Sequence, residues 1–134
     1  MLSRDEILGC DDLRREEVVI PEWHNGSVFV RVMTGTERDW LDAASLDDHG
    51  EVRSVHDRLA NYRGRLVALT ACTADGASLF VLSDAAALGK KAARALDRIV
   101  EVAQRINAMT DAEVSALTGD LKNAPDAASG SAWP

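Results

Sequence analysis

The stretch that decides the fold is residues 18–33, VVIPEWHNGSVFVRVM. It opens with an apolar triplet typical of a strand, and Pro21 ends this strand because proline cannot donate a hydrogen bond to a sheet. The pair Asn25-Gly26 is a strong turn signal, since both residues tolerate positive φ. After the turn, every second residue up to position 32 is a valine, which is the period of a strand. The stretch therefore predicts a β-hairpin with Trp23 near its tip.

Helical signals follow the hairpin. Thr34 and Glu37 have capping-box spacing and predict a helix over residues 37–44, with Trp40 and Leu41 facing inward. A second capping box, Thr110 and Glu113, predicts a helix near the end of the chain.

Two longer helices are predicted between these caps. The first carries an apolar stripe with steps of three and four residues, formed by Val52, Val55, Leu59, Tyr62, Leu66 and Leu69. Gly64 lies inside this stripe, and we expect the helix to pass through it, although glycine weakens a helix by about 1 kcal/mol relative to alanine. The second covers residues 90–109 and contains neither proline nor glycine after Lys90. The predicted fold class is α+β and mostly helical, an N-terminal hairpin followed by four or five helices in a small bundle.

Residues 1–17 are expected to form a separate N-terminal segment with a short helix, because Ser3 and Glu6 have capping-box spacing. Residues 18–122 are expected to form a single domain, and residues 123–134 a disordered tail of small side chains. Within the domain, residues 78–82 (SLFVL) are predicted to be either strand-like or buried.

Composition restricts the function. The formal net charge of −7 argues against non-specific binding to nucleic acid or to anionic membranes. No apolar run reaches the roughly 18 residues of a membrane helix, and the first residues do not resemble a signal peptide. We therefore expect a cytoplasmic protein whose thiols, Cys10 and Cys72, are reduced.

Motifs for catalysis are missing from the sequence. It contains no phosphate-binding loop, dinucleotide fingerprint, HExxH or GxSxG pattern. His49 and His56 have helical spacing, but a metal would need further ligands that the pattern does not supply, and His24 is expected to be solvated. Cys72 is expected to be a small apolar residue on a helix. We expect no enzyme activity, no metal and no cofactor.

Apolar surface is the alternative basis for function. The stripe over 52–69 is either a seam for a partner or, as we favour, the face that packs on the 90–109 helix. The last predicted helix carries a short apolar stripe, formed by Val114, Leu117 and Leu121, which docks either on the core or on a partner helix. The predicted partner-binding residues are Trp23, Val114, Leu117 and Leu121.

Several motifs in combination resemble the tail assembly chaperone family of long-tailed phages. They are residues 19–23 (VIPEW), 26–39 (GSVFVRVMTGTERD), 65–69 with Asp75-Gly76 and Leu79-Phe80, Ser83-Asp84, Leu88-Gly89, 95–98 (ALDR), 106–109 (INAM) and 121–123 (LKN). His24-Asn25 and Val81-Leu82 depart from the family pattern.

The resemblance implies a protein without catalysis that binds the tape measure protein and keeps it soluble during tail assembly. Further partners implied are tail tube subunits and a longer frameshifted form of the chain itself, with weak self-association. The expected location is the host cytoplasm, and the chaperone would be absent from the mature virion. The alternative is a structural component of the tail or head–tail joint that stays in the virion. A third hypothesis is that the protein is a small enzyme or a metal-binding protein.

Overall fold

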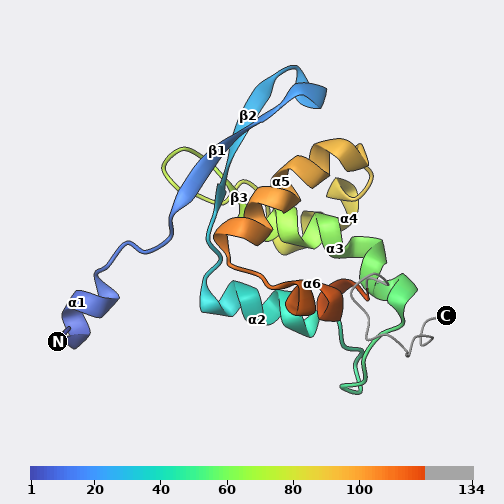
Figure 1. Cartoon of the computed structure of the whole chain (residues 1–134), viewed down its shortest axis with the longest axis horizontal. Coiled ribbons are helices and arrows are strands. Elements are labelled where there is room, and N and C mark those ends of the chain that lie inside the picture. Colours follow the sequence, from blue (N-terminus) through green and yellow to red (C-terminus); the bar gives the residue numbers. More distant parts are fainter. Residues whose placement is uncertain (120–134) are drawn as a thin grey trace.

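The computed structural model describes residues 1–119. Within them, a β-hairpin is followed by the five helices α2 to α6, and a short third strand extends the hairpin into a sheet (Figure 1). This confirms the predicted fold class, α+β with a hairpin followed by four or five helices. Leu121 and the predicted tail 123–134 lie outside the described residues.

The hairpin consists of β1 (Arg15–Ile20) and β2 (Gly26–Arg31), which pair antiparallel with Ile20 opposite Gly26. They are joined by η1, a 3-10 turn over Pro21–Trp23. The two residues with positive φ are His24 (58°) and Asn25 (57°), so the left-handed pair lies one residue earlier than the predicted Asn25-Gly26. Gly26 is already the first residue of β2.

A third strand, β3 (Ala71–Cys72), pairs antiparallel with β2 and gives the strand order β1-β2-β3. It follows α3 directly, because Ala71 leaves the helix with φ −70° and ψ 132°. Cys72 therefore lies in a strand, which corrects the expectation that it lies on a helix. Its side chain is buried, as expected.

The helices after the hairpin are α2 (Gly35–Ala43), α3 (Val55–Thr70), α4 (Ala85–Leu88), α5 (Ala93–Ile106) and α6 (Asp111–Thr118), with a 3-10 turn, η2 (Leu82–Asp84), before α4. Helix α3 is central, since α2, α4, α5 and α6 all contact it, and α5 also contacts both hairpin strands. The core lies between α3, α5 and the sheet, with its largest fully buried apolar side chains at Ile20, Val30, Leu66, Val67, Leu96 and Ile99. The predicted packing of the 52–69 stripe on the 90–109 helix is confirmed for α3 and α5, with Tyr62, Leu66 and Leu69 buried, but Val52 precedes α3, and Val52 and Leu59 are exposed.

Gly64 allows α4 to approach α3 closely. A Cβ atom at this position would lie 2.1 Å from the backbone oxygen of Ala85, the first residue of α4. Helix α3 passes through Gly64 as predicted, because the close contact compensates for the weak helix propensity of glycine.

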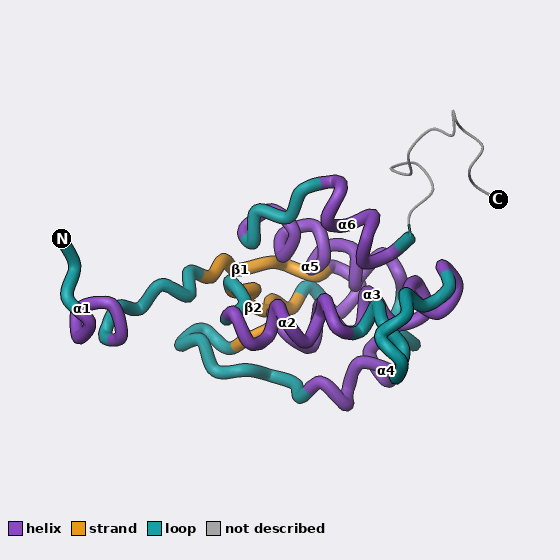
Figure 2. The backbone as a smooth tube through the Cα atoms, turned by 90° about the horizontal axis from the view of Figure 1, so that it is seen from below, coloured by secondary structure: helices purple, strands orange, loops and turns teal. Residues whose placement is uncertain are grey.

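The N-terminal helix α1 (Arg4–Leu8) begins with the predicted capping box of Ser3 and Glu6. None of its residues is buried, and an extended segment separates it from the rest of the protein (Figure 2). Strand β1 begins at Arg15, before residue 18, and the division into segments 1–17, 18–122 and 123–134 stays a prediction.

Two local expectations are wrong. Trp40 is 50% exposed, whereas its neighbour Leu41 is buried as predicted. Residues 78–82 form neither a strand nor a buried segment: Ser78 makes only an isolated bridge to Cys72, and Leu79, Val81 and Leu82 are exposed.

Candidate functional site

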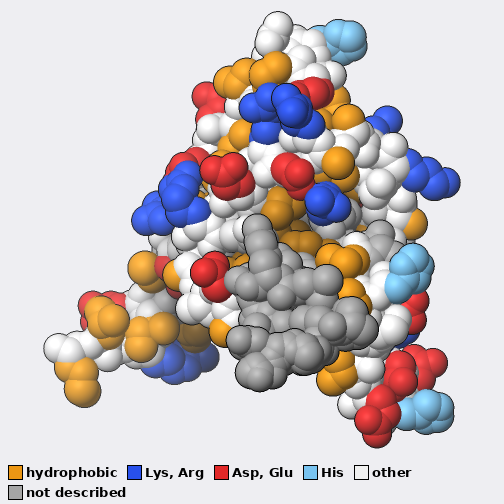
Figure 3. All heavy atoms as spheres, turned by 45° about the vertical axis from the view of Figure 1, so that its right-hand side comes forward, with side chains coloured by type: hydrophobic (Ala, Val, Ile, Leu, Met, Phe, Trp, Pro, Cys, Tyr) orange, Lys and Arg blue, Asp and Glu red, His pale blue; other side chains and the backbone are white. Residues whose placement is uncertain are grey.

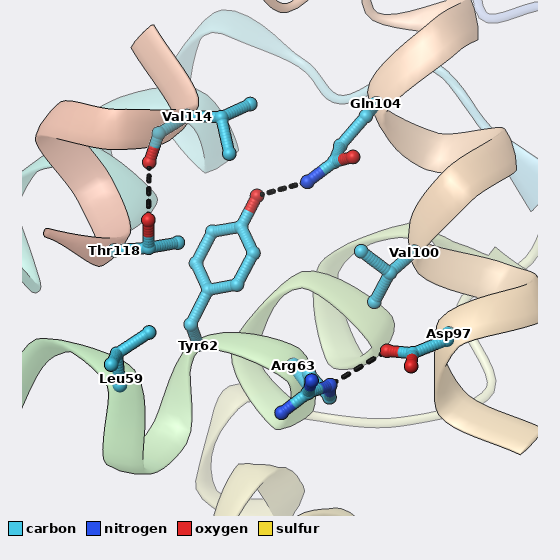
Figure 4. Close-up of a pocket in the computed structure, with 8 residues that line it drawn as sticks. All are labelled: Leu59, Tyr62, Arg63, Asp97, Val100, Gln104, Val114 and Thr118. Atoms are coloured by element: carbon cyan, nitrogen blue, oxygen red, sulfur yellow. Dashed lines mark hydrogen bonds and ion pairs between the residues drawn. The ribbon is translucent and has the colours of Figure 1, made fainter. Parts of the chain in front are cut away.

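One apolar groove lies between α3, α5 and α6 (Figure 4). We call it the α3–α6 groove; its volume is about 210 Å³, and it is lined by Leu59, Tyr62, Arg63, Asp97, Val100, Gln104, Val114 and Thr118. The Tyr62 ring points from α3 toward the space between α5 and α6, where its hydroxyl accepts a hydrogen bond from Gln104 Nε2 at 2.9 Å. Burial raises the pKa of Tyr62 and outweighs the opposing effect of Gln104, so the phenol stays neutral.

Charged side chains close one side of the α3–α6 groove. Arg63 Nε on α3 donates to Asp97 Oδ1 on α5 at 2.6 Å, and both side chains are about half exposed. An ion pair this exposed stabilises little, so its main effect is to shape the rim of the groove. Leu59 and Val114 supply the apolar floor on the opposite side.

A second groove is larger and more apolar. We call it the α2 groove; it has a volume of about 450 Å³ and is lined by Glu37, Trp40, Ala68, Leu69, Ser78, Phe80, Val81 and Leu82. Its walls are α2, α3 and the segment that leads into η2 and α4. Trp40 and Val81 are 50% and 64% exposed, and Leu82 is 39% exposed. Large apolar side chains gathered in one exposed place are typical of a binding surface.

One end of the α2 groove is fixed by an ion pair. Arg31 Nη1 and Nη2 donate to Glu37 Oε1 and Oε2 at 2.9 and 2.6 Å, and both side chains are largely buried. Arg31 also donates to Ser78 Oγ at 3.2 Å, so it ties β2, α2 and the third wall together. Burial opposes ionisation of Glu37, but the bonds from Arg31 and from the Thr34 backbone N–H prevail and lower its pKa.

Two arginines, Arg65 and Arg53, lie outside the lining of the α2 groove. Arg65 lies one helical turn before Ala68 and Leu69 on α3, which places it at the end of the same face. Arg53 Nε donates to the Leu46 backbone oxygen at 2.8 Å, in the connection between α2 and α3. Burial and, to a smaller extent, the charge of Arg53 lower the pKa of the Arg65 guanidinium. Among the described residues, neither has a carboxylate partner.

The hairpin tip is held onto α5. Glu22 beside the tip accepts hydrogen bonds from Arg98 Nε and Nη2 at 2.8 and 3.0 Å. The Arg98 bonds and the backbone N–H of Glu22 itself lower the pKa of Glu22 to about 2. Trp23, next to it, is half-buried and packs against the core.

The three predicted partner-binding residues that the structure describes do not lie together. Val114 lines the α3–α6 groove, Trp23 packs at the hairpin tip, and Leu117 is 7% exposed within the core. Leu121 lies outside the described residues. Their role in partner binding stays a prediction.

Trp40, Val81 and Leu82 were not predicted as partner-binding residues. The SLFVL run at 78–82 was a sequence signal for this surface, because no other segment was predicted as a strand that could pair with it. The departure of Val81-Leu82 from the chaperone pattern pointed to the same place.

Reactive side chains are dispersed. Cys10 is exposed, whereas burial raises the pKa of the Cys72 thiol and keeps it protonated at neutral pH. Within residues 1–119, no three or more His, Cys, Asp or Glu side chains are arranged to hold a metal ion. In the same range, no helix has the length and hydrophobicity needed to span a membrane.

Charges of both signs are mixed on the face shown in Figure 3, with apolar side chains visible between them. Acidic and basic groups there do not segregate into the broad basic patch that a phosphate backbone would require. The exposed apolar side chains of α1 project at the lower left.

The fold is similar to that of the tail assembly chaperone of bacteriophage HK97. The match covers 70% of this chain and 85% of that chain, with a TM-score of 0.55 and 18% sequence identity. At this identity the likeness concerns the fold, and at that level it confirms the resemblance found in the sequence. No protein-family model matches the chain, and no curated protein does.

Proposed function

We propose that this protein is a phage tail assembly chaperone that binds the tape measure protein and keeps it soluble while the tail is built. The observation that carries the proposal is the fold, which is shared with the HK97 tail assembly chaperone over 85% of that chain. The ordered series of sequence motifs from residue 19 to residue 123 supports it independently.

The surface fits this role physically. A tape measure protein is a long helix with apolar stripes, which aggregates unless the stripes are covered. Two open apolar grooves border α3, and grooves of this kind receive the apolar face of an amphipathic helix. The net charge of −7 would keep the resulting complex soluble through mutual repulsion.

The remaining parts of the proposal follow from the same role. The chaperone performs no reaction and needs no cofactor, because covering an apolar stripe requires only surface. It acts in the host cytoplasm and leaves before the virion is complete. Tail tube subunits and a longer frameshifted form of the chain are further partners, and self-association is weak.

Co-expression tests the proposal. The tape measure protein of the same phage is produced alone, with this chain, or with an unrelated acidic protein of similar size, and its soluble fraction is measured. We expect a several-fold rise only with this chain, and co-purification of the two proteins. An unchanged soluble fraction would refute the chaperone role.

A structural role in the tail or head–tail joint is the second candidate. It is favoured by α1, which stands apart from the protein body and exposes apolar side chains suited to joining copies into a ring. Mass spectrometry of purified particles separates the candidates: a structural component stays in the virion at fixed stoichiometry, whereas a chaperone is absent.

A further inference from the structure

The α2 groove has an unused apolar surface. Trp40 from α2 and Val81 and Leu82 from the segment before α4 are exposed around it, although each is large enough to form core if covered. Covering such side chains is favourable because it removes apolar surface from water. A volume of about 450 Å³ accepts a few side chains from one face of a helix, rather than a whole helix.

The charged groups near this groove differ in whether they are paired. Glu37, at the α2 N-terminal end, is already bound by Arg31. This carboxylate is engaged within the chain, so that end offers no strong attraction to a charged partner.

Arg65 attracts a carboxylate. It lies one helical turn before Ala68 and Leu69, which line the groove, and within the described part of the chain no acidic side chain pairs with it. A guanidinium binds a carboxylate strongly when two of its N–H groups donate to the two carboxylate oxygens. An unpaired cation beside an apolar groove therefore favours a partner that carries an acidic residue next to its apolar face.

We propose that the α2 groove binds an amphipathic helix of the partner, with apolar side chains against Trp40, Val81 and Leu82 and an acidic residue against Arg65. The inference rests on the proposed function for the source of this helix, which is the tape measure protein. The acidic residue also sets the direction in which the helix lies, because Arg65 adjoins the groove beside Ala68 and Leu69, whereas Glu37 in the lining is already paired with Arg31.

Trp40 provides a reporter at the site. The chain contains three tryptophans, at positions 23, 40 and 133, so a Trp23→Phe, Trp133→Phe variant leaves Trp40 alone. Overlapping tape measure peptides of about 25 residues, long enough for several helical turns, are titrated into this variant. We expect a blue shift of Trp40 emission with peptides that combine an apolar stripe and an acidic end.

Substitutions then locate the contact. Val81→Ser and Leu82→Ser should each weaken binding about tenfold, as expected for loss of one buried apolar side chain. Arg65→Glu should weaken it about fivefold, and replacing the peptide's acidic residue with arginine should restore binding to that variant. Lys91→Glu, an exposed charge change elsewhere, should leave affinity unchanged. Leu59→Ser in the α3–α6 groove tests the competing contact.

Co-expression with the full-length tape measure protein separates failure of this site from failure of the function. If a Val81→Ser, Arg65→Glu double variant solubilises the protein as well as the unchanged chain does, the site is wrong and the chaperone role stands. If Leu59→Ser abolishes binding instead, the α3–α6 groove is the contact and the inference is overturned. A concentration-dependent Trp40 shift without peptide would assign the groove to a second copy and would equally overturn it. Far-UV circular dichroism checks that each exposed-site variant is folded.

Discussion

Replacing Gly64 with alanine tests the arrangement on which the α2 groove depends. The added Cβ atom would lie 2.1 Å from the Ala85 backbone oxygen and 2.9 Å from the Ala85 carbonyl carbon. Ordinary contact begins at 3.4 Å, so the Ala85 oxygen must move away by about 1.3 Å. The obstructing group is backbone, which cannot rotate aside as the end of a flexible side chain can.

The free energy of this change combines two opposing effects. Alanine is a better helix former than glycine by about 1 kcal/mol, which favours the variant. Overpacking a well-packed contact costs about 1–3 kcal/mol, and displacement of α4 also disturbs the buried side chains of Ala85 and Leu88. We expect a net loss of about 2 kcal/mol in the free energy of unfolding, which corresponds to a fall in Tm of about 6–10 °C for a domain of this size.

The assay is thermal and urea denaturation followed by circular dichroism, with Gly35→Ala as the matched control. Gly35 is also helical, in the first turn of α2, but a Cβ there meets nothing within 4 Å. Gly35→Ala should therefore leave stability unchanged or raise it by at most about 1 kcal/mol. If Gly64→Ala also proves neutral or stabilising, α4 does not approach α3 as described, and the third wall of the α2 groove loses its support.

Three further predictions concern charges and thiols. Glu37→Gln should cost about 2–4 kcal/mol in urea unfolding, because it leaves the Arg31 guanidinium buried without a counter-charge. Because the pKa of Glu37 is lowered in the folded protein, the carboxylate contributes its full stabilisation above the ordinary carboxyl range and loses it as the pH falls through the lowered pKa. The free energy of unfolding of the unchanged protein should therefore converge on that of Glu37→Gln in acid. Parallel curves of stability against pH would contradict this. The pKa of the Glu22 carboxyl, measured by NMR, should be about 2 and should return toward the ordinary carboxyl value in Arg98→Gln. An ordinary pKa in the unchanged protein would show that the hairpin tip is not tethered to α5. In the folded protein Cys10 should react with a thiol reagent and Cys72 should not, because Cys72 is buried with a raised pKa; equal rates would place Cys72 at the surface.

Local sequence signals predicted local structure well. The capping boxes of Thr34 with Glu37 and of Thr110 with Glu113 form as expected, because each joins residues only three apart and depends on no distant contact. The hairpin was predictable for the same reason, although the left-handed pair shifted by one residue to His24 and Asn25. The strand β3 was not, since its two residues are defined only by pairing with β2.

The candidate site depends on distant contacts, which explains why the sequence placed it elsewhere. Apolar character alone put Trp40 inside, but α2 contacts the protein body through one narrow face, which Leu41 occupies. Leu117 was predicted as a partner contact on the same kind of evidence, and its burial comes from the way α6 docks on α3. The stripe at 114–121 was open to either interpretation until that docking was seen.

The exposed groove and the buried glycine contact belong to one stretch of the chain. Gly64 lets α4 lie directly on α3, where Ala85 and Leu88 are buried. The chain between β3 and α4 forms a wall of the α2 groove, where Arg31 donates to Ser78 Oγ, and it leaves Val81 and Leu82 64% and 39% exposed. A protein selected only for stability would replace such side chains with polar ones, since nothing in this packing requires them to be apolar. Their presence in a groove that the unpaired Arg65 adjoins is explained by a surface that is completed by another molecule.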